Sequence, residues 1–441
     1  MAFRCEHCGS RSGKWMGFCP QCLVQQPLVE DLPTPSQRSS RAAQPARTVT
    51  LDGAGSADAS HVPLGIGEFD RVLGGGLVGG SVMLLGGEPG VGKSTLLLQA
   101  AGAFAGKGRK VLMVSAEESV QQVAMRAERL AITAPDISLV AEDDVDRVLA
   151  TAEDPVPDLM VVDSIQTVGT SDTTGSPGGV SQIRESAARL IRFAKDRGVA
   201  TVLVGHVTKD GGIAGPKLLE HMVDVVLYLE GDQDRGVRAL RCLKNRFGAT
   251  HMVGVFEMTA DGLVEVADPS KAFLSDWESS VPGTIAFPAV EGRRSVLVEI
   301  QALTYSTQNP QPRRSVRGVE PARVHQLLAV LARHGEVFAS GCDVYVNVVG
   351  GWRVTEPGCD LPIALAMASS LLDVPLGPVA AWGEVGLAGE VRQVAYEARR
   401  RQEAERVGLE RIIAPDGRRS LRLQTALAEA GLVGSPLPGR T

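Results

Sequence analysis

Between residues 61 and 269, short apolar segments alternate with amphipathic segments along the chain. The apolar segments have the length and composition of strands, and they read SVMLLGG, KVLMVSAEE, DLMVVDS, VATVLVGH and DVVLYLEG. Strands that alternate with helices predict a parallel sheet with helices on its faces. We interpret two further segments, VRALRCLKNR and HMVGVFEMT, as antiparallel strands added to this sheet.

A second α/β series begins near Thr284. It contains SVLVEIQALT, a predicted helix around Arg323–Arg333, DVYVNVVGG and DLPIALAMASSLL, and we place the domain boundary between Pro269 and Thr284. Residues 27–60 are rich in Pro, Ser, Ala, Arg and Gly without a hydrophobic period, which predicts a flexible linker. The predicted parts are therefore residues 1–26, 27–60, 61–270 and 271–441.

The composition narrows the class of protein. Of the 441 residues, 44% are hydrophobic and 22% are charged, as in ordinary soluble globular proteins. The formal net charge of −6 argues against a uniformly basic nucleic-acid-binding surface but leaves room for a local basic channel. No apolar segment reaches the length needed to cross a bilayer, and the first residues lack the layout of a signal peptide. We therefore expect a cytoplasmic protein without a membrane partner, in which the cysteines stay reduced.

Four cysteines form two CxxC pairs near the N-terminus, Cys5 with Cys8 and Cys19 with Cys22. Each pair lets two thiolates converge from one tight turn, and two pairs complete a closed tetrahedral site. Because no coordination position stays open, we predict a zinc knuckle with a structural Zn²⁺ in residues 1–26. Chance clustering of reduced cysteines and a redox CxxC are the alternatives, but a redox site needs only one pair.

The segment GGEPGVGKST contains a phosphate-binding loop motif. It follows an apolar segment and precedes the helical TLLLQAAGAFA, which is the setting that the motif requires. Backbone N–H groups of such a loop face the phosphates of ATP at the positive end of the next helix. We expect Lys93 to reach the β- and γ-phosphates, and Ser94, with Thr95 as the less favoured alternative, to ligate Mg²⁺. The predicted nucleotide-binding residues are Gly87, Glu88, Pro89, Gly90, Val91, Gly92, Lys93, Ser94 and Thr95.

Further titratable residues stand where apolar segments end. Asp163 ends one of them, and we expect its carboxylate to join the Mg²⁺ shell. Glu117 and Glu118 end a strand that we place beside the strand of the phosphate loop, where one of them can polarise the attacking water. The alternative is that both begin a helix, where acidic residues favour the dipole. His206 ends another strand and could sense the γ-phosphate, although a lone His is more often structural.

These motifs occur together in a known family. GIGEFDRVLGGGLVGGS leading into the phosphate loop, with SAEES, VVDSIQT, GHVTKDGGIAGPK and KNRFG, resembles the bacterial RadA (Sms) DNA repair proteins over essentially the whole chain. The resemblance implies a RecA-like P-loop ATPase core in residues 61–270, assembled as a ring that we expect to be a homo-hexamer. It also implies a DNA-dependent ATPase that acts on single-stranded and branched DNA and promotes branch migration with the RecA recombinase. By position, the resemblance favours Glu117 over Glu118 as the catalytic glutamate.

Two segments match the central-channel DNA-binding loops of the RecA fold. They are GTSDTTGSPGGVSQIRE after Asp163 and TKDGGIAGPK after His206, where Gly and Ser suit backbone contacts to phosphate. For each cation in them, an ordinary surface loop remains the alternative. The cations concerned are Arg184, Lys209 and Lys217.

The resemblance also gives a role to Lys244 and Arg246 of KNRFG. In RecA-type and related hexameric helicase rings, cations at the end of this strand reach the nucleotide of the adjacent subunit. At a spacing of two, both residues are expected on one strand face. A solvated surface turn is the alternative. The predicted catalytic residues are Lys93, Glu117, Asp163, Lys244 and Arg246.

Residues 271–441 resemble the peptidase domain of Lon protease in SGCDVYVNVVGG, DLPIALAMASSLLD and WGEVGLAGEVRQV. That enzyme needs a Ser nucleophile and a Lys base, and the match places Leu361 and Ala398 at these positions. Ser369 and Ser370 lie two turns too far along the helix. We therefore predict a proteolytically inactive domain that forms the ring and contacts DNA. The candidate contacts to the DNA backbone are Arg313, Arg314 and Arg317, with a solvated charge run as the alternative.

Two other functions stay open at this point. An ATP-dependent protease of the Lon type fits a ring ATPase joined to a Lon-like fold, but the Ser–Lys pair is missing. A nucleotide-switched scaffold without motor activity fits the GGGL entry to the phosphate loop, which clock ATPases share.

Overall fold

The computed structural model describes residues 3–5, 7–8, 10–12, 16–24, 29–30, 60–173, 175–176, 178–206, 214–231, 236–274, 280–292, 294–417 and 421–432. The chain forms two compact units, residues 1–58 and residues 59–441. Within the described ranges, no helix is long and apolar enough to cross a membrane. The predicted linker lies outside the described residues except at 29, 30 and 60.

The N-terminal unit contains a small sheet of three strands among its described residues. These are β1 (Phe3–Arg4), β2 (Arg11–Ser12) and β3 (Val29–Glu30), in the order β2-β1-β3. Cys5 and Cys19 are buried in its core with apolar neighbours that include Phe3 and Val24. A core this small buries little apolar surface, so a metal bound by its thiolates would add stability that packing alone does not supply.

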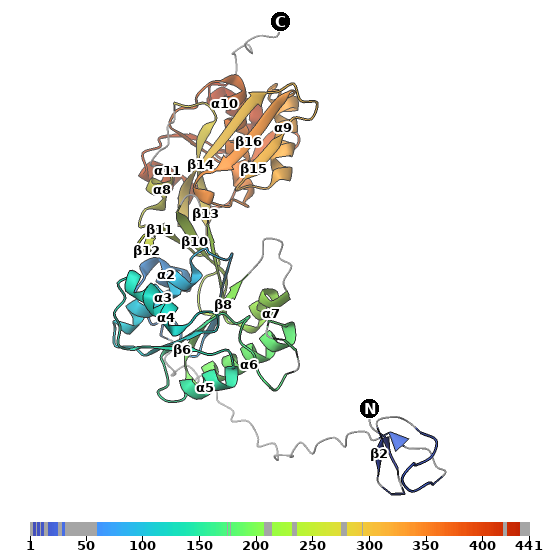
Figure 1. The fold of residues 1–441 in the computed structure, drawn as a ribbon. Helices are drawn as coiled ribbons and strands as arrows, with labels where there is room; N and C mark the ends of the chain where they lie inside the picture. The colour runs from blue at the N-terminus through green and yellow to red at the C-terminus, as the bar shows by residue number, and fades with distance from the viewer. Residues whose placement is uncertain are drawn as a thin grey trace. The chain divides into compact units, whose positions relative to one another are not determined.

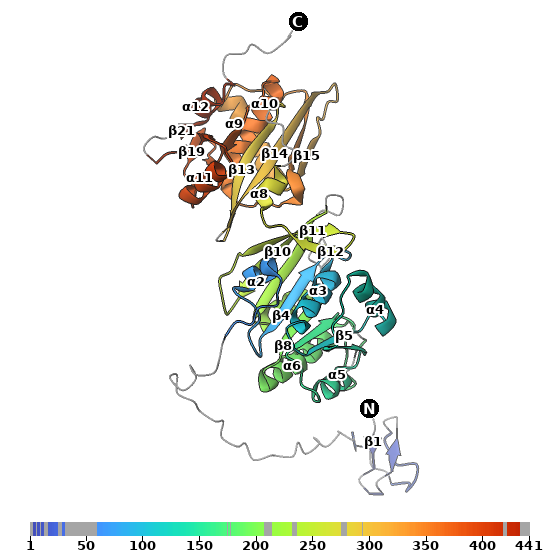
Figure 2. The same cartoon turned by 90° about the vertical axis from the view of Figure 1, so that its left-hand side faces the viewer.

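The larger unit begins with a sheet that has nine strands in the described residues, in the order β12-β11-β10-β9-β4-β8-β7-β5-β6 (Figures 1 and 2). The parallel strands are β4 (Val82–Gly87), β5 (Val111–Ser115), β6 (Ile137–Ala141), β7 (Leu159–Asp163), β8 (Ala200–His206) and β9 (Val225–Gly231). The antiparallel strands are β10 (Val237–Asn245), β11 (Val253–Thr259) and β12 (Gly262–Glu265). The predicted α/β class with a parallel sheet is therefore confirmed, and so are the two added antiparallel strands.

One expectation about the order of the strands was wrong. The strand that ends before Glu117 is β5, and it does not lie beside β4, because β8 and β7 stand between them. The neighbours of β4 are β8 and β9, so His206 rather than Glu117 ends the strand adjacent to the phosphate loop. Apolar segments show that a strand is buried, but they carry no information on its lateral neighbours.

Helices cover both faces of this sheet. Successive residues of β4 point to opposite faces, and both sets are apolar. Met83 and Leu85 of β4 pack in one core and Val82 and Leu84 in the other. The first core includes α2 (Gly67–Leu73), α3 (Lys93–Ala105) and α4 (Val120–Arg129). The second includes α5 (Val145–Ala152), α6 (Val180–Arg197) and the end of α7 (Ala214–Met222) (Figure 1).

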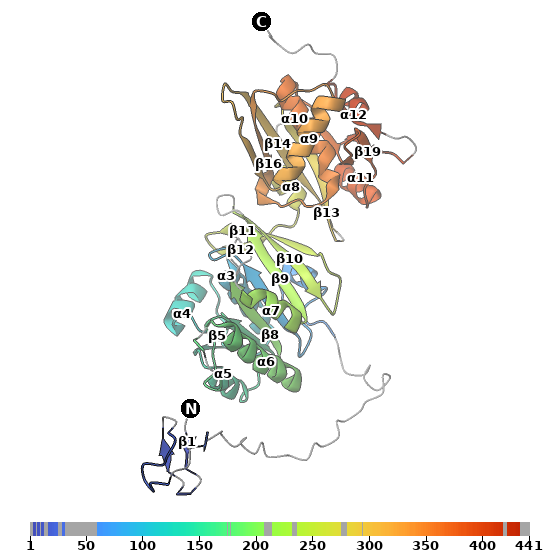
Figure 3. The ribbon, with the colours of Figure 1, turned by 90° about the vertical axis from the view of Figure 1, so that its right-hand side faces the viewer.

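The remaining part of the larger unit is a mixed sheet with six strands in the described residues, in the order β15-β16-β14-β13-β17-β20. These strands are β13 (Thr284–Glu291), β14 (Arg294–Ser306), β15 (Arg314–Arg317), β16 (Cys342–Val348), β17 (Val379–Ala381) and β20 (Arg411–Ile413). Its helices are α8 (Pro269–Phe273), α9 (Pro321–His334), α10 (Asp360–Leu372), α11 (Glu397–Arg406) and α12 (Leu423–Glu429). Helices α9 and α10 lie together against the sheet (Figure 3). The short strands β18 (Glu384–Val385), β19 (Glu390–Arg392) and β21 (Leu421–Arg422) form a separate small sheet.

Candidate functional site

The phosphate-binding loop connects β4 to α3. Gly92 caps the helix and Lys93 is its first residue, so the N–H groups of the loop lie at the positive end of a helix of 13 residues. A Cβ at Gly87 would lie 2.4 Å from the carbonyl oxygen of Leu229, so this position requires glycine for the loop to pass so close to β9. The sequence thus builds an anion-binding turn at the carboxyl end of a central strand.

Lys93 contacts the backbone of its own loop. The side chain is buried, with 4% of its surface exposed, and its Nζ donates to the carbonyl oxygens of Gly87 (2.9 Å) and Glu88 (3.0 Å). Burial lowers the pKa of this ammonium below its usual range, and the neighbouring carboxylates of Asp163 and Glu117 oppose that shift. Neutral carbonyls are weaker partners for an ammonium than phosphate is, so the loop is prepared for an anionic ligand.

The two predicted Mg²⁺ ligands lie in direct contact. Ser94 Oγ donates to Asp163 Oδ2 at 2.5 Å, which brings the first turn of α3 to the end of β7. Burial raises the pKa of Asp163 above its usual range, and the hydrogen bond from Ser94 is the largest effect that opposes this rise. A hydroxyl and a carboxylate that meet beside a phosphate site are the ligands that Mg²⁺ takes in phosphoryl-transfer proteins.

The structure separates the two candidate glutamates. Glu117 accepts a hydrogen bond from Ser164 Oγ and lies 3.3 Å from His206 Nε2, so it faces the phosphate loop. Glu118 instead forms an ion pair with Arg126 of α4. This arrangement favours Glu117 as the residue that can reach an attacking water. The predicted alternative, acids that begin a helix, describes the setting of Glu118 better, because α4 begins two residues after it.

Ser164 and Gln166 are residues of this site that the sequence analysis missed. Ser164 is fully buried and its only signal is that it follows Asp163 directly. Gln166 Nε2 donates to the carbonyl oxygen of His206 at 3.3 Å. Among the described residues, Gln166 Oε1 and His206 Nδ1 are both buried without a hydrogen-bond partner. The ends of β7 and β8 are thus tied together beside Glu117.

The first predicted DNA-binding loop is fixed at its base by Gln182 of α6. The Gln182 side chain accepts from the backbone N–H of Thr170 (2.9 Å) and donates to the carbonyl oxygens of Thr173 (2.6 Å) and Gly175 (3.2 Å). Arg184, the predicted DNA contact of this loop, is exposed on α6. Lys209 lies outside the described residues, and of Lys217 only the backbone, in α7, is described.

Lys244 and Arg246 lie at the edge of the sheet opposite the phosphate loop. Strand β10 runs antiparallel to β9, so Asn245 pairs with Val225 at the start of β9, whereas the phosphate loop begins beside the end of β9. The strand is irregular between Cys242 and Lys244 and ends at Asn245, so the expectation that both cations share one strand face was wrong for Arg246.

Both cations nevertheless point to one region. Lys244 Nζ donates to the carbonyl oxygens of Glu220 (2.8 Å) and Val223 (2.7 Å), and Arg246 pairs with Asp224 at 3.1 Å. These acceptors belong to the end of α7 and the residues just after it. Both cations therefore bind acceptors at the end of the sheet that lies away from the phosphate loop.

The four N-terminal cysteines converge as predicted. The sulfur atoms of Cys5, Cys8, Cys19 and Cys22 all lie within 4.8 Å of one another. Cys5 Sγ is 3.8 Å from Cys22 Sγ, and Cys8 Sγ is 3.6 Å from Cys19 Sγ. Four thiolates at this spacing fit the tetrahedral shell of Zn²⁺ and leave no position for a substrate.

The residues at the two expected protease positions lie on helices α10 and α11, and neither has a side chain that can act as a nucleophile or base. Leu361 is fully buried, and Ala398 is exposed on α11. Ser369 Oγ accepts from the N–H of Gly283 (2.8 Å) and donates to the carbonyl oxygen of Val374, while Ser370 Oγ accepts from the N–H of Thr304 (2.9 Å). Both serines satisfy backbone groups, so they act in folding.

The predicted arginines around β15 are not equivalent. Arg314 donates to the carbonyl oxygens of Arg313 (2.9 Å) and Cys342 (2.5 Å), which holds its guanidinium on the protein. Arg313 and Arg317 are exposed. Of the three candidates for DNA contact, these two present the more accessible charge.

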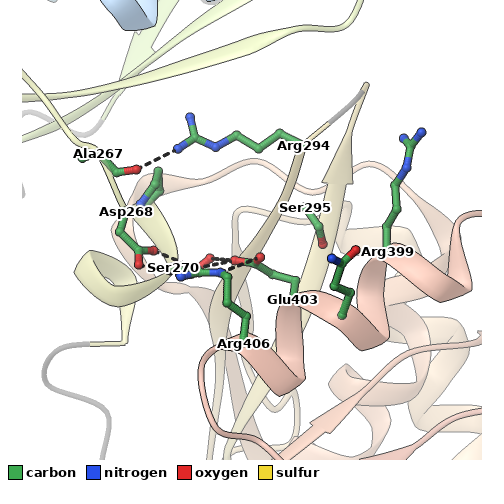
Figure 4. Close-up of a pocket in the computed structure, with 10 residues that line it drawn as sticks. Ala267, Asp268, Ser270, Arg294, Ser295, Arg399, Glu403 and Arg406 are labelled. Carbon is green, nitrogen blue, oxygen red and sulfur yellow. Dashed lines mark hydrogen bonds and ion pairs between the residues drawn. The ribbon is translucent and has the colours of Figure 1, made fainter.

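A cavity of about 460 Å³ lies between α8, β14 and α11 (Figure 4). Arg406 enters it and pairs with Asp268 (2.8 Å) and Glu403 (2.7 Å), and Glu403 also accepts from Ser270 Oγ at 2.5 Å. These opposite charges neutralise one another across the segment that leads into α8. The ion pair of Arg406 with Asp268, the N-cap residue of α8, therefore links α11 to the start of α8.

Comparison with known proteins places these features in context. A family model described as an AAA domain matches residues 68–212. The chain is 44% identical over 420 residues to the DNA repair protein RadA of Bacillus subtilis, with 94% of this chain and 92% of that protein covered. It is 46% identical over 430 residues to the DNA repair protein RadA of Escherichia coli, again with 94% and 92% covered. Among solved structures, a KaiC-like protein from Pyrococcus horikoshii matches with a TM-score of 0.39 at 23% identity, covering 47% of this chain and 99% of that one.

Proposed function

Because the chain belongs to the RadA family of DNA repair proteins, we propose that this ATPase forms a ring, in the form of a homo-hexamer, that moves on single-stranded and branched DNA. In this proposal it promotes branch migration of recombination intermediates together with the RecA recombinase in the cytoplasm. The observation that carries the proposal is the position of Lys244 and Arg246 at the sheet edge opposite the phosphate loop. A second subunit is needed to bring these cations to a nucleotide.

The length of β10 supports action in trans. The strand pairs Arg238 with Gly231 at one end of β9 and Asn245 with Val225 at the other. At about 3.3 Å for each residue, these ends are roughly 20 Å apart, which is beyond the reach of either cationic side chain. In a ring, Lys244 and Arg246 exchange their present acceptors for the phosphates of the neighbour, where an Arg and a Lys meet the charge that develops during transfer.

The residues at the carboxyl edge of the sheet have different roles in ATP hydrolysis. Lys93 donates to the β- and γ-phosphates in place of the carbonyls that it contacts here. Ser94 and Asp163 hold Mg²⁺, which offsets phosphate charge when it is bound. Glu117 orients the attacking water and accepts its proton, and His206, which lies 3.3 Å from Glu117, senses the γ-phosphate.

The other parts of the chain have supporting roles. The four cysteines of the N-terminal unit hold a structural Zn²⁺. Residues 271–441 form a proteolytically inactive platform for the ring and for DNA, with Arg313 and Arg317 as exposed contacts to the DNA backbone. The boundaries proposed for the parts are residues 1–26, 27–60, 61–270 and 271–441.

A subunit-mixing experiment tests the action in trans. Glu117→Gln and Arg246→Ala each remove DNA-stimulated ATP hydrolysis when they are present in every subunit. In a mixed ring, an Arg246→Ala subunit that receives Arg246 from a Glu117→Gln neighbour has a complete site. We therefore expect the mixture to recover a substantial part of the wild-type rate, up to about one quarter for random equal mixing, since a complete site then requires one particular order of neighbours. No recovery in rings shown to be mixed would mean that Arg246 acts in its own subunit.

The motor activity is tested with wild-type protein and Lys93→Ala in a branch-migration assay, with and without RecA. Wild type is expected to extend the branched product in an ATP-dependent way, and Lys93→Ala is expected to be inactive because it cannot hold the phosphates. If single-stranded DNA leaves the wild-type ATPase rate unchanged and no branch migration occurs, a nucleotide-switched scaffold is the better description. ATP-dependent degradation of casein by the purified protein would instead support the protease.

A further inference from the structure

Strand β10 also carries a buried arginine at the end that lies near the phosphate loop. Arg238 has 4% of its surface exposed, although arginine is rarely so buried. Its Nε donates to the carbonyl oxygen of Val91 at 3.0 Å, and its Nη1 donates to the carbonyl oxygen of Val237 at 2.9 Å. Val91 is the residue before Gly92 in the phosphate-binding motif, so this side chain holds the loop from a strand that is distant in the sequence.

The acceptor of this hydrogen bond has a direct consequence for phosphate binding. A trans peptide unit is planar, and its C=O and N–H groups point in opposite directions. The carbonyl of Val91 shares its peptide unit with the N–H of Gly92, the N-cap residue of α3. A guanidinium that fixes the carbonyl on one side therefore fixes the direction of this N–H on the other, and the motif uses such N–H groups to bind phosphate.

The surrounding strands are shaped to admit this contact. A Cβ at Gly231 of β9 would lie 2.4 Å from the carbonyl oxygen of Val237 and 2.5 Å from Cδ of Arg238, so glycine at this position leaves room for both the strand and the arginine. A Cβ at Gly92 would lie 2.7 Å from Cε of Met258 on β11. The loop thus packs closely against the strands that carry Arg238 and its neighbours, and the contact is part of a fitted surface.

We infer that Arg238 is a positioning residue for nucleotide binding, which orients the peptide between Val91 and Gly92 in the phosphate loop. Arg238 need not touch the nucleotide itself. On the function proposed above, β10 then joins the phosphate loop of one subunit, through Arg238, to the cations that act on the neighbour, through Lys244. The orientation of the loop, however, is a property of the single chain and is testable without DNA or a ring.

The test compares the full-length variants Arg238→Met and Arg238→Lys with wild type and with Arg147→Met. Met keeps the length of the side chain without its donors, and Arg147 is a matched control because 74% of its side chain is exposed on the same domain. We expect Arg238→Met to bind a fluorescent ADP analogue about tenfold more weakly and to raise the KM for ATP by a similar factor, with a smaller change in kcat. Arg238→Lys is expected to recover part of the affinity, and Arg147→Met to bind like wild type.

Amide hydrogen exchange of the segment 87–94 gives a second readout. In the ADP-bound state, this segment is expected to exchange faster in Arg238→Met and Arg238→Lys than in wild type, while the segment 111–115 of β5 keeps its protection. The inference is overturned if a folded Arg238→Met, with unchanged melting in the absence of nucleotide, binds the analogue within twofold of wild type. If that variant does not fold, wild-type affinity and exchange in Arg238→Lys overturn it as well. If the Arg238 variants show these changes in nucleotide binding but DNA does not stimulate ATP hydrolysis by the wild type, the result counts against the proposed motor and not against the role of Arg238.

Discussion

Both α/β regions of the larger unit bury charged side chains. Arg400 in the C-terminal region and Lys93 in the ATPase core differ in the partners that they contact. In the C-terminal region, Arg400 is 1% exposed and pairs with Glu356, while its Nη1 and Nε donate to the carbonyl oxygens of Pro288 (2.6 Å) and Ala395 (3.1 Å). In the ATPase core, buried Lys93 donates to two backbone carbonyl oxygens of its own loop, those of Gly87 and Glu88. A charge with several fixed partners stabilises a fold, whereas a charge on replaceable partners can bind a ligand.

A similar contrast separates Ser369 from the two serines of the nucleotide site. Ser369 in the C-terminal region exchanges hydrogen bonds with backbone groups on both sides, and this arrangement has no place for a substrate. Ser94 and Ser164 in the ATPase core instead donate to the carboxylates of Asp163 and Glu117. Carboxylates that are held by short side chains at a sheet edge stay available for a metal ion or a water. Similar architecture therefore places these serines against carboxylates in one region and against backbone groups in the other.

The largest expected effect concerns Arg400, the buried cation of the C-terminal region. Arg400→Met leaves Glu356 partly buried without its cation, so we expect the free energy of unfolding of that region to fall by about 3 kcal/mol. The measurement is urea denaturation of the full chain, together with the ATPase rate at low urea. The double variant Arg400→Met with Glu356→Gln is expected to regain part of the loss, because no unpaired charge remains. A drop in kcat of Arg400→Met without loss of stability would break the comparison.

The next effect separates the two glutamates of the ATPase core. Glu117→Gln keeps an acceptor for Ser164 but removes the base, so we expect kcat to fall by about 100-fold with nucleotide binding retained. Glu118→Gln removes only the ion pair with Arg126, and its kcat is expected to stay within about threefold of wild type. Steady-state ATP hydrolysis and binding of a fluorescent ATP analogue measure both variants. The opposite ranking would assign the water to Glu118.

The two regions also show which structural features the sequence could predict. The apolar segments of β4, β5, β7, β8 and β9 predicted strands because both faces of this sheet are covered, and the CxxC spacing predicted the cluster of sulfur atoms. The order of the strands was not predictable, since an apolar segment does not specify its neighbour, and the strand of Glu117 was misplaced for that reason. Arg238 was missed as well, because its partner Val91 is 147 residues away and only the folded sheet brings the two together.

The smallest effect tests a hydroxyl that the sequence did not single out. Ser164→Ala removes the donor to Glu117, and the carboxylate then loses one of the two groups that orient it. We expect kcat to fall by about tenfold while the KM for ATP stays near its wild-type value, because Ser164 contacts the base and not the phosphate loop. Ser369→Ala is the matched control, a buried serine whose loss costs about 1–2 kcal/mol of stability but leaves kcat unchanged. If both serine variants lose stability alone and keep wild-type kcat, Ser164 belongs with the structural hydroxyls, and Glu117 is held by His206 without its help.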